Sequence, residues 1–142
     1  MLTKIAYSTE ATATGGGRDG KSATTDGALA VTLAVPKEMG GNGGGNNPEQ
    51  LFAVGYAACY LGAMRFAASS EKLGTVPADA SVTSTVSIGP RDEGGFGLQV
   101  ELKVSMPGVD RETAQKIVDR GHFICPYSNA TKGNIDVTTT LV

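Results

Sequence analysis

The chain has 142 residues, of which 40% are hydrophobic and 18% are charged, and its formal net charge is −2. This size and composition predict one globular domain over residues 1–142. They give no argument for binding to nucleic acid or to an anionic membrane surface, since both favour a basic excess. No apolar signal core follows the first residues. The sequence also has no uninterrupted run of about 18 apolar residues, the length needed to span a membrane, so we expect a cytoplasmic protein.

The first 46 residues are expected to contribute short strands and loops. Residues 3–7 and 28–35 are rich in β-branched and apolar residues and are bounded by turn-forming residues, a pattern typical of strands. Between them, residues 15–20 predict a glycine-rich loop or hairpin tip. This loop matches the dinucleotide-binding pattern GxGxxG, but no helix is expected after it, so the pattern does not indicate a nucleotide site. Residues 40–46, rich in Gly and Asn, are expected to form a mobile loop.

The clearest local signal predicts a long helix over residues 48–73. Asn47 is a good N-cap and Gly74 a typical stop. Residues 51–68 are apolar nearly all round, with Arg65 as the one charge, a pattern typical of a buried helix. At about 1.5 Å per residue the helix would be roughly 39 Å long, about as long as a globule of this size is wide. One subunit could hardly bury it, so we expect a homodimer.

The second half of the chain predicts a strand pair, two helices and a last strand. Alternating apolar residues mark the strands, and capping residues mark the helices. The expected elements are strands at 80–88 and 96–106, a helix from Asp110 to about Gly121, a short helix from Pro126 to Gly133, and a strand at 135–142. This order of strands and helices predicts an α+β fold with mainly antiparallel sheets.

The two cysteines, Cys59 and Cys125, are the residues best suited to chemistry. In a reducing compartment such a pair is either two unrelated core residues or a redox couple. Cys59 lies inside the apolar helix, which alone predicts an inert thiol with a raised pKa. Cys125 directly precedes Pro126 at the expected start of a short helix, where free backbone N–H groups favour a thiolate.

His122, the only histidine, leaves further interpretations open. Together with Cys59 and Cys125 it could supply three ligands to zinc, although no fourth ligand is evident. The ordinary alternative is a capping or surface imidazole near a helix end, and a single histidine makes a Ser-His-Asp triad improbable. A non-catalytic ligand-binding module with two buried thiols also stays open.

Five segments stand out together in chain order. They are residues 17–20 (GRDG), 47–52 (NPEQLF), 55–59 (GYAAC), 122–130 (HFICPYSNA) and 133–134 (GN). These segments resemble the organic hydroperoxide resistance (Ohr) branch of the OsmC/Ohr family, and the resemblance covers essentially the whole chain. It implies an OsmC/Ohr-like α+β fold with a long buried central helix, in an intertwined homodimer.

The resemblance also implies a function and four site residues. Cys59 would be the peroxidatic thiolate that reduces organic (alkyl or fatty-acid) hydroperoxides to alcohols, and Cys125 would resolve its sulfenic acid into a disulfide. Arg18 and Glu49 would hold the thiolate ready, the arginine as a permanent cation and the glutamate as its bidentate partner. No bound cofactor is implied, and a lipoyl dithiol, as dihydrolipoamide or on a lipoylated protein, would reopen the disulfide. The OsmC branch shares this chemistry, and relative rates on alkyl hydroperoxides and hydrogen peroxide would separate the two.

The spacing of these residues raises a geometric question. Glu49 and Cys59 are ten residues apart, about 15 Å along one straight helix, so a single Arg18 could not easily contact both. Either the guanidinium acts across two subunits or the helix breaks near Gly55, and we expect the former. The apolar neighbours of Cys59 that face the site are expected to line a pocket that favours bulky organic hydroperoxides over hydrogen peroxide. These neighbours are Phe52, Tyr56, Tyr60, Ala63 and Met64.

Overall fold

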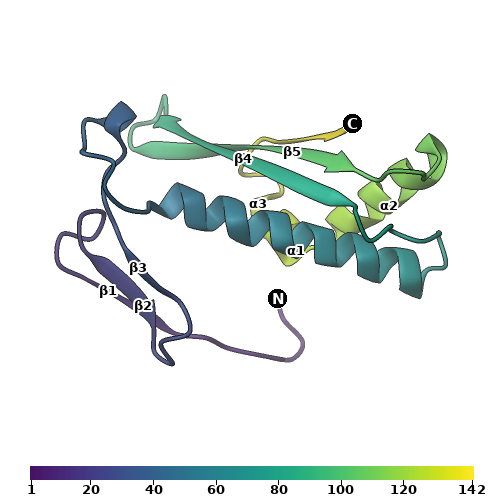
Figure 1. The fold of residues 1–142 in the computed structure, drawn as a ribbon, viewed down its shortest axis with the longest axis horizontal. Helices are drawn as coiled ribbons and strands as arrows, with labels where there is room; N and C mark the ends of the chain where they lie inside the picture. Colours follow the sequence, from purple (N-terminus) through teal and green to yellow (C-terminus); the bar gives the residue numbers. More distant parts are fainter. The chain divides into compact units, whose positions relative to one another are not determined.

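The computed structural model describes residues 1–142, and the chain divides into two units, Met1–Leu51 and Phe52–Val142. Each unit holds one three-stranded sheet (Figure 1). Helix α1, Pro48–Ser70, begins in the first unit and continues without a break into the second. The α+β class is therefore confirmed.

The N-terminal unit is an antiparallel meander. Strand β1 (Ala11–Thr14) pairs with β2 (Lys21–Thr24), and β2 pairs with β3 (Ala30–Thr32). The glycine-rich segment 15–20 closes the β1–β2 hairpin, as predicted. After β3 comes a short 3-10 helix, η1 (Lys37–Met39).

Two of the strand predictions in this unit need correction. Residues 3–7 form no strand and are exposed throughout, and the strand expected at 28–35 is reduced to β3. The first paired strand begins at Ala11 instead. A strand forms where a neighbouring strand completes its backbone hydrogen bonds. The strands that pair here are rich in Ala, Ser and Thr and lack the hydrophobic pattern by which strands are predicted from sequence.

Helix α1 begins as the sequence predicts. The side chain of Asn47 accepts a hydrogen bond from the backbone N–H of Gln50 (2.9 Å), and the side chain of Gln50 accepts one from the backbone N–H of Asn47 (3.1 Å). This reciprocal pair is a capping box, which satisfies two of the free N–H groups at the helix start.

The end of α1 lies three residues before the predicted one, at Ser70. Lys72 adopts a left-handed conformation with φ of 54°, and the backbone N–H of Leu73 donates to the carbonyl of Ala68 at 3.0 Å. These bonds form the usual helix-ending motif, with lysine at the position that glycine normally takes. Gly74 was therefore a misleading stop signal.

In the C-terminal unit, a sheet and helices enclose the hydrophobic core. Its elements are β4 (Ser81–Pro90), β5 (Phe96–Ser105), α2 (Arg111–Ile124), α3 (Pro126–Thr131) and β6 (Val137–Leu141). Strand β5 pairs antiparallel with β4 and parallel with β6. Side chains of α1, β5 and α2 make up most of the core, and α1 runs along one face of the sheet (Figure 1).

Helix α2 approaches α1 closely at Gly121. A Cβ atom there would lie 2.7 Å from Cγ of Met64, so a glycine is required for this approach. The hydroxyl of Tyr60 donates to the carbonyl of Val118 at 2.7 Å, which joins the same two helices. The predicted N-cap of α2 is confirmed, since Asp110 accepts from the backbone N–H of Thr113 at 3.0 Å.

One face of α1 stays uncovered. Val54 is 71% exposed and Phe66 62%, and Ala58 and Gly62 lie exposed between them at intervals of four residues. The helix is also long and apolar enough that its length and composition alone would fit a membrane span, a test that core helices of soluble proteins pass as well. Its opposite face, with Tyr56, packs in the core.

Candidate active site

The two thiols lie in contact in the C-terminal unit. Sγ of Cys125 is 3.5 Å from Sγ of Cys59, and neither cysteine is in a disulfide. Cys59 is half-buried on α1, whereas Cys125 is fully buried. A disulfide bond is about 2.05 Å long, so an approach of about 1.5 Å would join the two sulfur atoms.

Cys125 occupies the junction of two helices. Its backbone N–H donates to the carbonyl of Gly121 at 2.8 Å, which ends α2, and its carbonyl accepts from the N–H of Asn129 at 3.0 Å, which opens α3. The sequence predicted that the start of α3 would favour a Cys125 thiolate. The Cys125 side chain makes no capping hydrogen bond, and the backbone N–H of Tyr127 in the first turn of α3 lowers the pKa of Cys59 instead.

The surroundings of Cys59 act on its thiol in opposite directions. Burial raises the pKa of Cys59, as the sequence predicted, and the hydrogen bond from the backbone N–H of Tyr127 lowers it by a smaller amount. A buried thiolate therefore needs a cation nearby to form at neutral pH. The Tyr127 ring lies close to α1 at Gly55. A Cβ atom at Gly55 would lie 2.9 Å from the Tyr127 hydroxyl oxygen, so a larger residue there would force the ring to move.

Arg18 and Glu49 form the expected bidentate ion pair within the N-terminal unit. The two guanidinium nitrogens donate to the two carboxylate oxygens at 2.7 and 3.0 Å. The hydrogen bond from Arg18 holds the pKa of Glu49 below its usual value. The Glu49 side chain is 12% exposed and that of Arg18 40%, so the guanidinium keeps an accessible surface. The structure thus gathers the four predicted site residues into two pairs, one in each unit, and the break of α1 near Gly55 that we considered is not present.

Most of the apolar neighbours of Cys59 named above are buried and so are not open to a substrate. Four of its five residues, Tyr56, Tyr60, Ala63 and Met64, are buried in the core of the C-terminal unit, on the face of α1 that packs against its neighbours. Phe52 is only partly buried, and its ring centroid lies 5.9 Å from that of Tyr127. Of the five predicted residues, only Phe52 is not buried.

His122 does not join the thiols. Its Nδ1 lies 2.9 Å from the hydroxyl of Ser128, and its Nε2 lies 2.8 Å from the hydroxyl of Thr139. Burial lowers the pKa of His122, and its ring packs on that of Tyr60 at 4.5 Å. The three-ligand zinc arrangement is therefore not formed, and no group of three or more His, Cys, Asp or Glu side chains gathers elsewhere.

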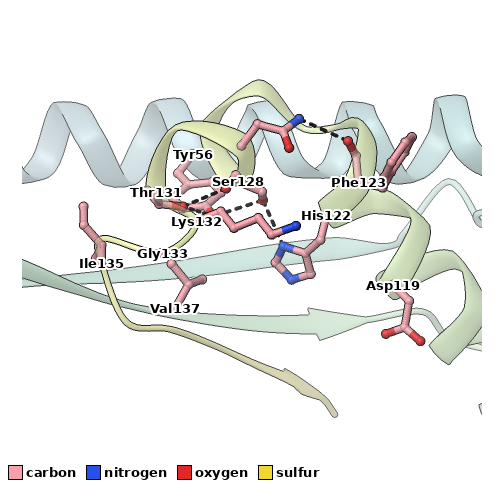
Figure 2. A pocket seen from close by; sticks show the side chains of 11 residues that line it. Tyr56, Asp119, His122, Phe123, Ser128, Thr131, Lys132, Gly133, Ile135 and Val137 are labelled. Carbon is pink, nitrogen blue, oxygen red and sulfur yellow. Dashed lines mark hydrogen bonds between the residues drawn. The ribbon is translucent and has the colours of Figure 1, made fainter.

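A cavity of about 470 Å³, which the sequence did not reveal, opens beside His122 (Figure 2). Asp119 and Lys132 contribute charged side chains to its wall, and Ile135 and Val137 contribute apolar ones. Neither cysteine lines it. Its residues come from the continuous stretch 119–137, which runs from α2 through α3 to β6, and from Tyr56 of α1, which is distant in sequence. No local pattern predicts that Tyr56 meets this stretch.

Comparisons with known proteins place the chain in a family. Residues 41–140 match the family model described as OsmC-like protein. The organic hydroperoxide resistance protein of Xanthomonas axonopodis pv. citri is 53% identical over 139 residues, which cover 97% of this chain and 96% of that protein.

Solved structures agree. An organic hydroperoxide resistance protein from Legionella pneumophila superposes with a TM-score of 0.91 at 46% identity, covering 97% of this chain and 98% of that one. The organic hydroperoxide resistance protein OhrB of Bacillus subtilis gives a TM-score of 0.85 at 38% identity, with coverage of 97% and 100%. The chain therefore belongs to the OsmC-like family, within the branch of the organic hydroperoxide resistance proteins.

Proposed function

We propose that the protein is a cysteine-based peroxidase that reduces organic hydroperoxides to alcohols in the cytoplasm. The observation that carries this proposal is the contact between a half-buried thiol, Cys59, and a fully buried one, Cys125. One thiol is open to a substrate from solvent, and the other is reachable only by its neighbour. The names of the relatives support the substrate class.

The reaction divides into three balanced steps. The Cys59 thiolate attacks the distal oxygen of the hydroperoxide, the O–O bond breaks, and the alkoxide takes a proton to leave as an alcohol, so that Cys59 becomes a sulfenic acid. The Cys125 thiol then displaces water from that sulfenic acid and forms the Cys59–Cys125 disulfide. A lipoyl dithiol, free as dihydrolipoamide or carried on a lipoylated protein, reduces this disulfide and is itself oxidised to the cyclic disulfide.

Arg18 supplies the cation that the buried Cys59 thiolate requires. Glu49 fixes the guanidinium through two hydrogen bonds but leaves part of it accessible. In this proposal the Arg18–Glu49 pair of one subunit serves the thiols of a homodimer across the subunit boundary. The exposed apolar face of α1, from Val54 to Phe66, supports association with a second copy. Val54→Asp should then yield monomers in analytical ultracentrifugation and lower peroxidase activity together.

The deciding experiment is a coupled assay with dihydrolipoamide, lipoamide dehydrogenase and NADH. We expect steady NADH oxidation with tert-butyl hydroperoxide or a fatty-acid hydroperoxide. A stoichiometric burst without turnover would argue for another reductant, and no peroxide consumption at all would reject the peroxidase in favour of a binding module. A higher kcat/KM for organic hydroperoxides than for hydrogen peroxide separates this activity from one directed at hydrogen peroxide.

A further inference from the structure

A chain of buried hydroxyl groups runs beside the two thiols and centres on Ser128. Its hydroxyl lies 2.9 Å from Nδ1 of His122 and 3.0 Å from the hydroxyl of Tyr56. The Tyr56 hydroxyl lies 3.3 Å from that of Thr131, which donates to backbone carbonyls of α3 at 3.0 and 3.1 Å. These contacts join α1, α2 and α3 in the core, and Figure 2 shows them at the edge of the cavity.

Counting protons gives one direction in which every hydrogen bond of this network forms. The one proton of Thr131 is used on carbonyl oxygens, so Tyr56 must donate to Thr131. The proton of Tyr56 is then used, so Ser128 donates to Tyr56, and for the same reason Nδ1–H of His122 donates to Ser128. A neutral imidazole with its proton on Nδ1 accepts at Nε2, which is the nitrogen facing the hydroxyl of Thr139. One tautomer of His122 thus satisfies every group.

The chain spans the segment that carries the buried thiol. His122 lies three residues before Cys125 and Ser128 three residues after it, so their hydrogen bond closes the turn between α2 and α3. Tyr56 lies three residues before Cys59, close to one helical turn along α1. Ser128 therefore ties the turn that bears Cys125 to the helix that bears Cys59.

We propose that His122, acting through Ser128, is a positioning residue that keeps Cys125 in contact with Cys59. This inference rests on the resolving role of Cys125 in the proposed function. Its consequence concerns the second step only: a displaced Cys125 leaves the Cys59 sulfenic acid exposed to a second hydroperoxide, which oxidises it to a sulfinic acid and leaves as an alcohol. The first step, the attack of Cys59 on the hydroperoxide, does not involve these hydrogen-bonded hydroxyl groups.

The kinetic test compares two substitutions of His122. Asparagine places an amide N–H near the position of Nδ1 and can still donate to Ser128, whereas phenylalanine keeps the ring packing on Tyr60 and loses the donor. We expect His122→Phe and Ser128→Ala to form the disulfide about tenfold more slowly, the effect of one lost buried hydrogen bond. Both should become sulfinic at about tenfold lower peroxide by mass spectrometry, with the first peroxide consumed at the wild-type rate. His122→Asn should stay near wild type, as should Thr140→Val, an exposed neighbour of Thr139.

Equal sulfinic acid formation in the wild type, His122→Phe and Ser128→Ala would overturn the inference. An equal decrease in the rate of disulfide formation in His122→Asn and His122→Phe would overturn it as well. Should His122→Phe not fold, Ser128→Ala alone carries the comparison. A second readout needs no variant: in untagged, ¹⁵N-labelled protein the single imidazole should show a protonated Nδ1 and an unprotonated Nε2, and the opposite tautomer overturns the directed chain. A wild-type protein that consumes no peroxide defeats the proposed function instead, and the imidazole spectrum still reports on the chain.

Discussion

Cys59 and Cys125 differ in access to solvent although their sulfur atoms are 3.5 Å apart. Cys59 reaches the surface from α1, and Cys125 is enclosed at the junction of α2 and α3. This asymmetry fits the roles that we propose for them: the accessible thiol would meet the hydroperoxide first, and the enclosed thiol would react with its neighbour.

Single substitutions should separate these roles. Cys59→Ser should abolish turnover, because it removes the nucleophile. Cys125→Ser should consume one equivalent of peroxide and then stall, with Cys59 progressing to sulfinic acid. Quantification of peroxide, together with intact mass, measures both outcomes. Retention of full activity in Cys59→Ser would mean that the mechanism is wrong.

Loss of the guanidinium should raise the pKa of Cys59. Burial already raises that pKa, and Arg18→Ala removes the proposed counter-charge, so peroxide reduction should slow and its rate should rise only at higher pH. Glu49→Ala should have a smaller effect, since the charge stays and only its position is lost. The alkylation rate as a function of pH reports the thiol pKa directly. An unchanged value in Arg18→Ala would point to another stabilising group.

Substrate preference should depend on Phe52. Each methylene buried contributes about 0.8 kcal/mol, so four methylenes could favour a long-chain hydroperoxide over hydrogen peroxide by roughly a hundredfold in kcat/KM. Phe52→Ala should reduce this ratio through the fatty-acid substrate alone. The matched control is Phe96→Ala, since Phe96 is an exposed phenylalanine at the far start of β5. A ratio that survives Phe52→Ala would assign the binding surface to other residues.

Gly121→Ala should destabilise the fold. The added methyl group would lie 2.7 Å from Met64, and overpacking of this kind costs about 1–3 kcal/mol. Gly89→Ala is the control, because nothing lies within 4 Å of a Cβ atom there. Urea unfolding measures both variants. If Gly121→Ala unfolds at the wild-type midpoint, the approach of α2 to α1 must be looser than described.

Acid should weaken the fold through His122. Its pKa lies below the ordinary value of 6.5 because burial disfavours the imidazolium, an effect that Asp119 partly opposes. As the pH falls below about 6.5, His122 becomes protonated in the unfolded chain but stays neutral in the folded protein, so the free energy of unfolding should decrease. The carboxylates of Glu49 and Glu71 have lowered pKa values, so their protonation decreases the free energy of unfolding only below about pH 4.5. His122→Asn should flatten the profile between pH 6.5 and 5, and an unaltered slope would exclude His122 as its source.

The sequence was informative wherever a local pattern decides the structure. Alternation marked β4 and β5, the Asn47 cap marked the start of α1, and the motifs around Cys59 and Cys125 indicated the family. It failed where long-range pairing decides, as for β1 and β2, and where one face of α1 had to be chosen: the apolar residues assigned to a substrate pocket pack in the core. The hydroxyl chain through Ser128 was equally out of reach, because its members come from separate elements that meet only in the fold.

The enclosure of Cys125 also determines what a thiol reagent can count. In the native, reduced protein a water-soluble alkylating agent meets one sulfur atom quickly, and the other becomes labelled only when the α2–α3 junction opens. A labelling time course should therefore have two phases of equal amplitude, the fast one belonging to Cys59 and the slow one timing local opening around Cys125. In the unaltered wild-type protein, Cys125 thus reports on local opening of the core.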